Sequence, residues 1–360
     1  MERAAKRHKD ATAIDEDLVS SICMSGWRRW LRKILALSLG FVVAMIFAEV
    51  FLRVAGVVRN VGPSYTVYDA HLGKRLKRNL SCLRHTPEFS IQVSTNSLGF
   101  RGPEPKGNEE GGIVFIGDSF TMGHGVSDGE EYPALVFRML SEHLDGGVIP
   151  VVNMGMGDNG NGRWIKLLRE EVAQFKPRLV VLQVCGNDFR DNTNERLFRL
   201  NGNEQLQELP IPARSWKRRV QSMIEFLPGV AYSHVFCLVK QVVSKSGGGG
   251  QKASDTHNEQ VASDEPTPAE KLTRALIRRS VEICHSQGWP IVILVVEDGW
   301  NGQTFDFLAR DPSLHLVTIP SKKERPDIYF LNDGHWNSTG HEYVGNLMVE
   351  VIAGLPQFRM

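Results

Sequence analysis

The sequence lacks a surplus of charge of either sign. Its 360 residues include 42 Lys and Arg against 41 Asp and Glu. Proteins that bind nucleic acid usually concentrate basic residues to neutralise phosphates, and this even balance gives no support to such a partner. We therefore expect no nucleic-acid function.

Cysteine is also scarce, and the few present are far apart in the chain. No two of them have the short spacing of a thiolate metal site, and scattered cysteines specify no disulfide pairing. Cys185 lies inside an apolar run and is predicted to be a buried thiol. The five cysteines are Cys23, Cys82, Cys185, Cys237 and Cys284.

One apolar run, Ile34–Leu52, is long enough to cross a membrane. At about 1.5 Å per residue it extends about 28 Å, close to the thickness of the hydrocarbon core. Residues 1–33 carry eight Lys or Arg against five acids, which places them in the cytoplasm by the positive-inside rule. We expect a basic cytoplasmic tail over 1–33, a transmembrane anchor over 34–55, and the rest of the chain outside the cytoplasm.

A cleaved signal peptide is the alternative interpretation of this segment, because it also has a basic start and an apolar middle. The run is longer than a usual signal core, and no clean small-residue cleavage site follows it, so the anchor is favoured. The only charge in the run is Glu49, which could pair with Arg53 four residues later near the interface. No function is assigned to Glu49.

The pattern changes at about residue 111. Residues 56–110 are rich in turn signals, with one predicted strand at Phe89–Val93, and are interpreted as a spacer or small β appendage. From there to residue 355, short apolar runs alternate with segments of helical period, which predicts a parallel sheet covered on both faces. We expect a three-layer α/β domain over 111–355. The predicted strands are Ile113–Ile116, Val148–Val152, Leu179–Val184, Ile291–Val296 and Leu316–Ile319.

An insertion at 189–270 interrupts this alternation. Its first part, Ser215–Val243, is basic and amphipathic and could form a lid, a helix resting on the membrane surface, or a helical subdomain packed on the core. The second part, Ser244–Pro268, is of low complexity and is predicted to be disordered.

Two polar blocks follow the first two predicted strands. Gly117-Asp118-Ser119 places a serine where open α/β sheets bind ligands, although such a serine is more often a helix N-cap. The block Asn153-Met154-Gly155-Met156-Gly157-Asp158 could point backbone N–H groups into an oxyanion hole, or could be an ordinary tight turn.

Two further blocks complete the pattern. Gly186-Asn187-Asp188 follows the third strand, where the Asn187 amide could donate to an oxyanion or form an Asx turn. Near the C-terminus, Asp333-Gly334-His335 precedes a helix that we expect to begin with a Thr339…Glu342 capping box. His335 could take the serine proton while a nearby carboxylate orients it.

Together these blocks resemble the SGNH (GDSL-type) serine hydrolases, over about residues 112–353 and in the same chain order. The block Asn96-Ser97-Leu98-Gly99-Phe100-Arg101-Gly102 also resembles bacterial membrane-anchored members. The resemblance implies a flavodoxin-like α/β/α domain and ester hydrolysis through an acyl-enzyme, without metal or cofactor. It implies Ser119 as nucleophile, His335 as general base and Asp333 as its orienting acid. The oxyanion hole would comprise the Ser119 N–H, a glycine of the second block and Asn187.

The sequence departs from the usual family pattern in two places. The usual Asp-x-x-His spacing would put the acid at Asn332, so Asp333 is chosen by a shortened Asp-x-His form that looks like some polysaccharide-modifying relatives. The second block offers two glycines, and we choose Gly157, with Gly155 as the alternative.

The predicted substrate is an acylated small molecule or glycan, with O-acetyl esters of an envelope or extracellular carbohydrate as first choice. O-acetyl transfer to a sugar hydroxyl is an alternative within the same chemistry. A non-catalytic carbohydrate-binding or scaffolding protein of the envelope, and a lipase acting through the apolar positions of 216–243, are the other candidates.

Overall fold

The computed structural model describes residues 2–58, 60–104, 111–143, 149–213, 216–227, 229–247, 266–296, 305–312 and 314–358. The chain forms two compact units. One comprises Met1–Arg59 and Ser233–Gly247, and the other comprises Asn60–Tyr232 and Gly248–Met360.

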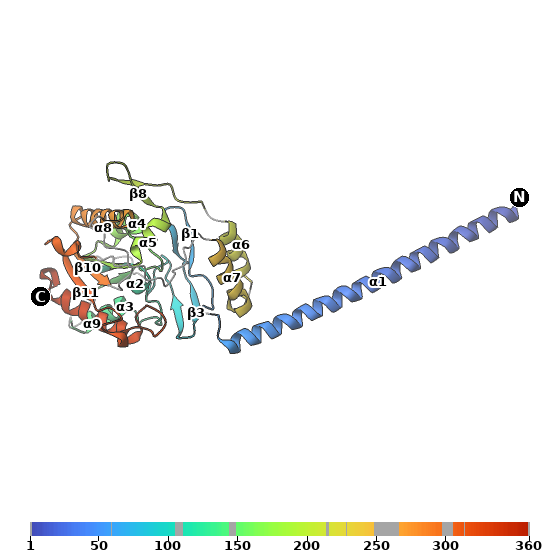
Figure 1. The fold of residues 1–360 in the computed structure, drawn as a ribbon, viewed down its shortest axis with the longest axis horizontal. Coiled ribbons are helices and arrows are strands. Elements are labelled where there is room, and N and C mark those ends of the chain that lie inside the picture. The colour runs from blue at the N-terminus through green and yellow to red at the C-terminus, as the bar shows by residue number, and fades with distance from the viewer. Residues whose placement is uncertain are drawn as a thin grey trace. The chain divides into compact units, whose positions relative to one another are not determined.

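The larger unit is built on a parallel sheet of five strands in the order β11-β10-β7-β5-β6. Figure 1 labels two of these strands, β10 and β11. Every residue of β5, β7 and β10 is buried, as expected when helices cover both faces. The order matches the flavodoxin-like doubly wound fold, and the predicted fold class is confirmed. The strands are β5 (Ile113–Ile116), β6 (Val151–Asn153), β7 (Leu179–Cys185), β10 (Ile291–Val296) and β11 (His315–Ile319).

Two hydrophobic clusters fill the space between the sheet and its helices. Residues of β5 contribute alternately to the two clusters. Ile113 and Phe115 pack with α3 (Tyr132–His143) and α9 (Ser338–Gly354), whereas Val114 and Ile116 pack on the opposite face of the sheet. Successive side chains of a strand point to opposite faces, which explains this division.

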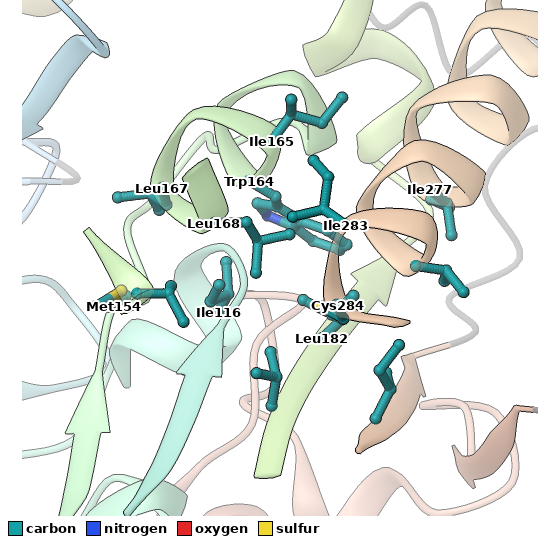
Figure 2. Close-up of a cluster of buried hydrophobic side chains, with 14 of the residues drawn as sticks. Ile116, Met154, Trp164, Ile165, Leu167, Leu168, Leu182, Ile277, Ile283 and Cys284 are labelled. Carbon is teal, nitrogen blue, oxygen red and sulfur yellow. The ribbon is translucent and has the colours of Figure 1, made fainter. Parts of the chain in front are cut away.

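The second cluster lies beneath α4 (Asn161–Glu170) and α8 (Pro268–Ser286), with α5 (Asp188–Glu195) beside them. Figure 2 shows this cluster around Trp164, whose side chain is fully buried. Replacing so large a buried side chain with alanine typically costs about 3–5 kcal/mol. The two clusters hold the strand ends, and therefore the loops that follow them, in fixed positions.

The helical segment between β6 and β7 divides into two elements. α4 ends at Glu170, and a 3-10 helix, η1 (Val172–Phe175), follows it. Lys176 then adopts a left-handed conformation with φ 40°, which ends the helical path.

The start of α9 differs from its prediction. Asn337 is the N-cap, because its side chain accepts a hydrogen bond from the Gly340 N–H. The predicted capping box of Thr339 and Glu342 is therefore wrong. Both residues lie inside the helix, two positions later than a capping box would require.

The segment before the sheet forms two antiparallel hairpins. The predicted strand Phe89–Val93 corresponds to β4, while its partner β3 was not predicted. The hairpins share a small core with the loops after β5 and β6 through Met122 and Met156. They therefore pack on the loops at the carboxyl ends of β5 and β6. The strands are β1 (Thr66–Asp69), β2 (Gly73–Leu76), β3 (Ser81–His85) and β4 (Ser90–Ser94).

The insertion contains a further hairpin and a helix in the larger unit. β8 (Phe198–Leu200) pairs with β9 (Leu206–Glu208), and α6 (Trp216–Glu225) follows, before the short η2 (Val230–Tyr232). Of the segment predicted to be disordered, the first residues end a helix and Pro268 begins α8, while residues 248–265 lie outside the described residues.

The smaller unit consists of α1 (Glu2–Ala55) and α7 (His234–Gly247). Residues Trp30–Ala55 of α1 are long and apolar enough to cross a membrane, which includes the predicted run. Glu49 near the end of this stretch accepts hydrogen bonds from the Ser233 hydroxyl at 2.9 Å and from the N–H groups of His234 and Val235 at 2.9 and 3.1 Å. A carboxylate at a helix N-terminus satisfies N–H groups that have no partner within the helix.

Candidate active site

Ser119 lies directly after β5, at the start of the four-residue helix α2 (Ser119–Met122). The N-cap of this helix is Asp118, whose carboxylate accepts from the Phe120 N–H at 2.9 Å. The capping interpretation of the serine is therefore wrong, and its hydroxyl is left for another partner. The loop before Ser119 passes so close to Gln183 that a Cβ at Gly117 would lie 2.4 Å from the Gln183 side-chain oxygen.

His335 provides the partner of that hydroxyl. The Ser119 Oγ lies 2.6 Å from His335 Nε2, although the two residues are 216 positions apart in the chain. The other ring nitrogen, Nδ1, is hydrogen-bonded to Asp333 Oδ1, which also accepts from the His335 backbone N–H at 3.1 Å. The structure thus brings the three predicted residues into one chain of hydrogen bonds, an arrangement suited to nucleophilic catalysis.

The environment keeps Asp333 ionised. Burial alone would raise its pKa, but contacts with His124 and His335 outweigh this and hold the pKa well below its usual range. An ionised carboxylate can stabilise the imidazolium that forms when His335 takes a proton. Asn332, the position of the usual family acid, is exposed.

His124 is part of this cluster, which the sequence did not indicate. Its Nε2 lies 3.6 Å from Asp333 Oδ2, and its ring centroid lies 4.5 Å from that of His335. Burial lowers the pKa of His124, against the opposing effect of Asp333, so this ring favours the neutral form. The only sign of this role in the sequence is that His124 lies two residues after α2, the helix that begins at Ser119.

The same three side chains are the group best placed to hold a metal ion among the described residues. Their ligand atoms lie within 4.8 Å of one another. However, both ring nitrogens of His335 are already engaged, one by the serine hydroxyl and one by Asp333. A metal bound by His335 would have to displace one of these contacts, so hydrogen bonding explains the arrangement better than ligation.

The two candidate glycines of the second block have different surroundings. A Cβ at Gly155 would lie 2.3 Å from the Met122 backbone nitrogen, and the Gly155 N–H already donates to Asn153 Oδ1 at 2.9 Å. A Cβ at Gly157 would lie 3.8 Å from that of Ser119. Within the described part of the chain, the Gly157 N–H has no acceptor. Gly155 is therefore tightly enclosed with its N–H engaged, whereas the Gly157 N–H is available to a ligand beside Ser119.

Asn187 is held by two neighbours. Its Nδ2 donates to Asp191 Oδ2 at 3.1 Å, and its Oδ1 accepts from the Cys185 thiol. An amide group has two protons, so one remains for a ligand. Burial raises the pKa of Asp191 to about 6, although Arg190 opposes the shift. Cys82, Cys185, Cys237 and Cys284 are buried, and none of these four forms a disulfide.

His341, a second histidine near the C-terminus, has a structural environment. It is fully buried in α9, and its Nδ1 accepts from the Tyr132 backbone N–H at 3.2 Å. Burial lowers its pKa from 6.5 to about 3, with smaller contributions from Arg101, His335 and His124. A histidine that is neutral and enclosed in this way supports packing between α3 and α9.

The block before the sheet contributes a buried arginine. Arg101 has a fully buried side chain and donates to the carbonyls of Met122, Gly123 and Val126, with Asp128 3.3 Å from its guanidinium. These carbonyls belong to the loop after the nucleophile helix. Arg101 therefore fixes the backbone that carries His124, a role the sequence resemblance did not specify.

Comparison with known proteins agrees with this geometry. The GDSL-like lipase/acylhydrolase family matches residues 115–343, more than half of the chain. No curated protein matches the sequence.

Several solved structures are similar over about two thirds of the chain. An SGNH-hydrolase family esterase, AlinE4, is 16% identical, with 68% of this chain and 96% of that one covered and a TM-score of 0.34. A lipase/acylhydrolase from Enterococcus faecalis is 17% identical over 68% and 96%, with a TM-score of 0.28. A two-domain esterase active on acetylated mannans is 12% identical over 70% and 51%, with a TM-score of 0.36. These sequence identities and TM-scores are too low to support any argument about the substrate of this chain.

Proposed function

The chain belongs to the GDSL-like lipase/acylhydrolase family and is a hydrolase of carboxylic esters; on this premise we propose that it removes small acyl groups, such as O-acetyl, from an envelope or extracellular carbohydrate. The single observation that supports Ser119 as the nucleophile is its 2.6 Å contact with His335 Nε2. In this proposal the enzyme needs neither a metal nor a cofactor.

The first half of the reaction forms an acyl-enzyme. Ser119 Oγ attacks the ester carbonyl carbon while its proton passes to His335 Nε2. Asp333 stabilises the resulting imidazolium through Nδ1. The carbon–oxygen bond to the alcohol then breaks, and the leaving alkoxide takes the proton from Nε2.

The negative charge of the tetrahedral intermediate is placed on the former carbonyl oxygen. The N–H groups of Ser119 and Gly157 and the second amide proton of Asn187 are the proposed donors. Each such donor typically contributes about 10²- to 10³-fold in rate, because it is oriented before the charge develops.

The second half depends on the acceptor. Water attacking the acyl-enzyme gives hydrolysis, whereas a sugar hydroxyl held in its place gives O-acetyl transfer, and both use His335 as the base. Release of free acetate measured beside acetyl transfer to an added glycan would distinguish them. Hydrolysis is preferred because it needs no second binding site.

The proposed location rests on the N-terminal segment. The apolar stretch Trp30–Ala55 and the basic residues before it support a single-pass anchor with the N-terminus in the cytoplasm and the catalytic domain outside. The proposed organisation is a tail over 1–33, the anchor over 34–55, the hairpin appendage over 56–110 and the hydrolase domain over 111–355. Residues 189–270 form an insertion in that domain.

Acyl-chain and leaving-group profiling of the purified full-length chain tests the proposal. We expect the highest kcat/KM with acetyl esters and a decline as the acyl chain lengthens, with Ser119→Ala inactive throughout. A preference for long chains would favour the lipase alternative. Failure of Ser119 to react with a serine-directed phosphonate, with no ester hydrolysed, would favour the non-catalytic carbohydrate-binding or scaffolding protein.

A further inference from the structure

We propose that the two N-terminal hairpins are part of the catalytic machinery, with Glu88 and Lys74 as positioning residues for opposite sides of the active site. This inference rests on the proposed function and deepens it. Glu88 would hold the loop that carries Asp333 and His335, and Lys74 would hold the loop that carries Gly157.

Glu88 lies in the turn between β3 and β4 and contacts the acid–base loop directly. Its Oε1 accepts from the Asn332 N–H at 2.9 Å and its Oε2 accepts from the Asp333 N–H at 2.8 Å. One carboxylate therefore holds two successive backbone amides that are 244 and 245 residues away in the chain. Hydrogen bonds in which the acceptor is charged are shorter and stronger than neutral ones, so this contact restrains the loop.

The turn carrying Glu88 also contacts the site through a ring. Phe89 packs edge-on against His124, with centroids 5.2 Å apart, and lies 5.1 Å from Phe330. His124 in turn stands beside Asp333 and His335. The β3–β4 hairpin thus binds the backbone of the loop that carries Asp333 and also packs against His124, which faces the Asp333 carboxylate.

Lys74 makes the corresponding contact on the other side. It lies in β2, and its Nζ donates to the carbonyls of Gly157 and Asp158 at 2.8 and 2.7 Å. Asp158 has φ 51°, a left-handed conformation that few residues other than glycine, asparagine and aspartate adopt. A cation bound to both carbonyls stabilises this turn, and with it the direction of the Gly157 N–H.

Both contacts act on backbone that must not move during catalysis. A misplacement of about 1 Å in a catalytic group can lower the rate about 100-fold. The two loops belong to distant parts of the sheet edge, one after β6 and one before α9. Hairpins that hold both loops fix the distance between the oxyanion donors and the base, which the sheet alone does not determine.

The two residues should produce different kinetic signatures. Loss of Glu88 frees Asp333, and an imidazolium that loses its carboxylate partner gives up its proton at lower pH. The fall in kcat/KM on the acid side of its pH profile, called the acid limb below, should therefore occur at lower pH than in wild type. Loss of Lys74 affects the oxyanion side, so kcat should fall without a shift of that limb.

The test uses the full-length protein, with p-nitrophenyl acetate hydrolysis and phosphonate labelling of Ser119 as two readouts. We expect Glu88→Ala to lower kcat roughly 10- to 100-fold with little change in KM and to shift the acid limb downward. Glu88→Gln, which keeps one acceptor oxygen, should recover part of both effects. Lys74→Met should lower kcat by a similar factor with the limb unchanged.

Glu104→Ala is the matched control. Glu104 also accepts hydrogen bonds from a backbone N–H and a side chain, both of Ser97, but it holds a turn of the appendage away from the triad. Its loss should leave kcat and the pH profile unchanged. If Glu88→Ala kept the wild-type rate and profile, or lost only thermal stability, the positioning role would be wrong. A wild-type chain inert to both probes would instead contradict the proposed function itself.

Discussion

At the scale of single residues, the acid in this chain lies two positions before the histidine, whereas the usual family spacing is three. Asp333, and not Asn332, contacts the Nδ1 atom of His335. We expect Asp333→Asn to lower kcat by roughly 10³- to 10⁴-fold with little change in KM, because an amide favours the wrong imidazole tautomer. Asn332→Ala should have a much smaller effect, since its backbone N–H remains. Steady-state kinetics on an acetyl ester measures both. A larger loss in Asn332→Ala would show that the acid is misassigned.

His341 gives a prediction of pH-dependent stability. Its pKa is lowered from 6.5 to about 3, so below pH 6.5 the unfolded chain takes up a proton that the folded chain refuses. The contribution to stability is complete above pH 6.5 and is lost as the pH falls towards 3, by an amount on the order of 5 kcal/mol. Thermal unfolding of wild type and His341→Gln from pH 4 to 8 should therefore show a flatter profile for the variant.

The same variant also separates the two histidines. His341→Gln should retain substantial turnover at pH 8, whereas His335→Gln should be inactive. If His341→Gln were inactive while folded, and His335→Gln retained turnover, the assignment of the base would be reversed. A pH profile of stability identical to that of wild type would mean that folding does not lower the pKa of His341, which would contradict the prediction.

Single residues also mark the limit of what the sequence predicts about the site. Ser119, Asp333 and His335 were predicted because they belong to polar blocks that lie at the ends of predicted elements and occur in the chain order of the SGNH family, and it was this resemblance that implied their roles. Glu88, Lys74 and His124 were not. The contacts of Glu88 and Lys74 join segments 83 to 245 residues apart, and nothing in the local pattern distinguishes them from ordinary surface charges.

At the scale of elements, the buried strands were the most predictable features. Continuous apolar runs such as Ile291–Val296 occur where both faces of a strand are covered, so composition alone indicates them. The hairpins β1–β2 and β8–β9 were not predicted because their strands are short and mostly exposed or half-buried. The helix ends were also misjudged, since caps such as Asn337 depend on which polar side chain reaches the first N–H groups.

The contact between Glu49 and α7 makes a prediction about an element. The carboxylate accepts from the N–H groups of His234 and Val235 at the start of this helix. Glu49→Ala should leave these groups without acceptors and fray the first turn, at a typical cost of about 1 kcal/mol. Hydrogen exchange over residues 233–237 of the membrane-embedded protein should become faster. Arg53→Ala, which removes a partner of Glu49 but no contact with α7, serves as control, and equal exchange in all three proteins would exclude a capping role.

At the scale of the whole molecule, the chain is an ester hydrolase of the GDSL-like family whose helix α1 is long and apolar enough to cross a membrane, and we propose that this helix anchors the catalytic domain outside the cytoplasm. The basic residues before Trp30–Ala55 predict that the N-terminus stays in the cytoplasm and that everything after the anchor is outside. A phosphatase reporter fused after residue 360 should be active, and a β-galactosidase fused there should be inactive. Replacing Arg28, Arg29, Arg32 and Lys33 with glutamine should weaken or invert this pattern, because those charges set the orientation. A reporter active only in the cytoplasm would place the catalytic domain there and exclude an extracellular carbohydrate as the substrate.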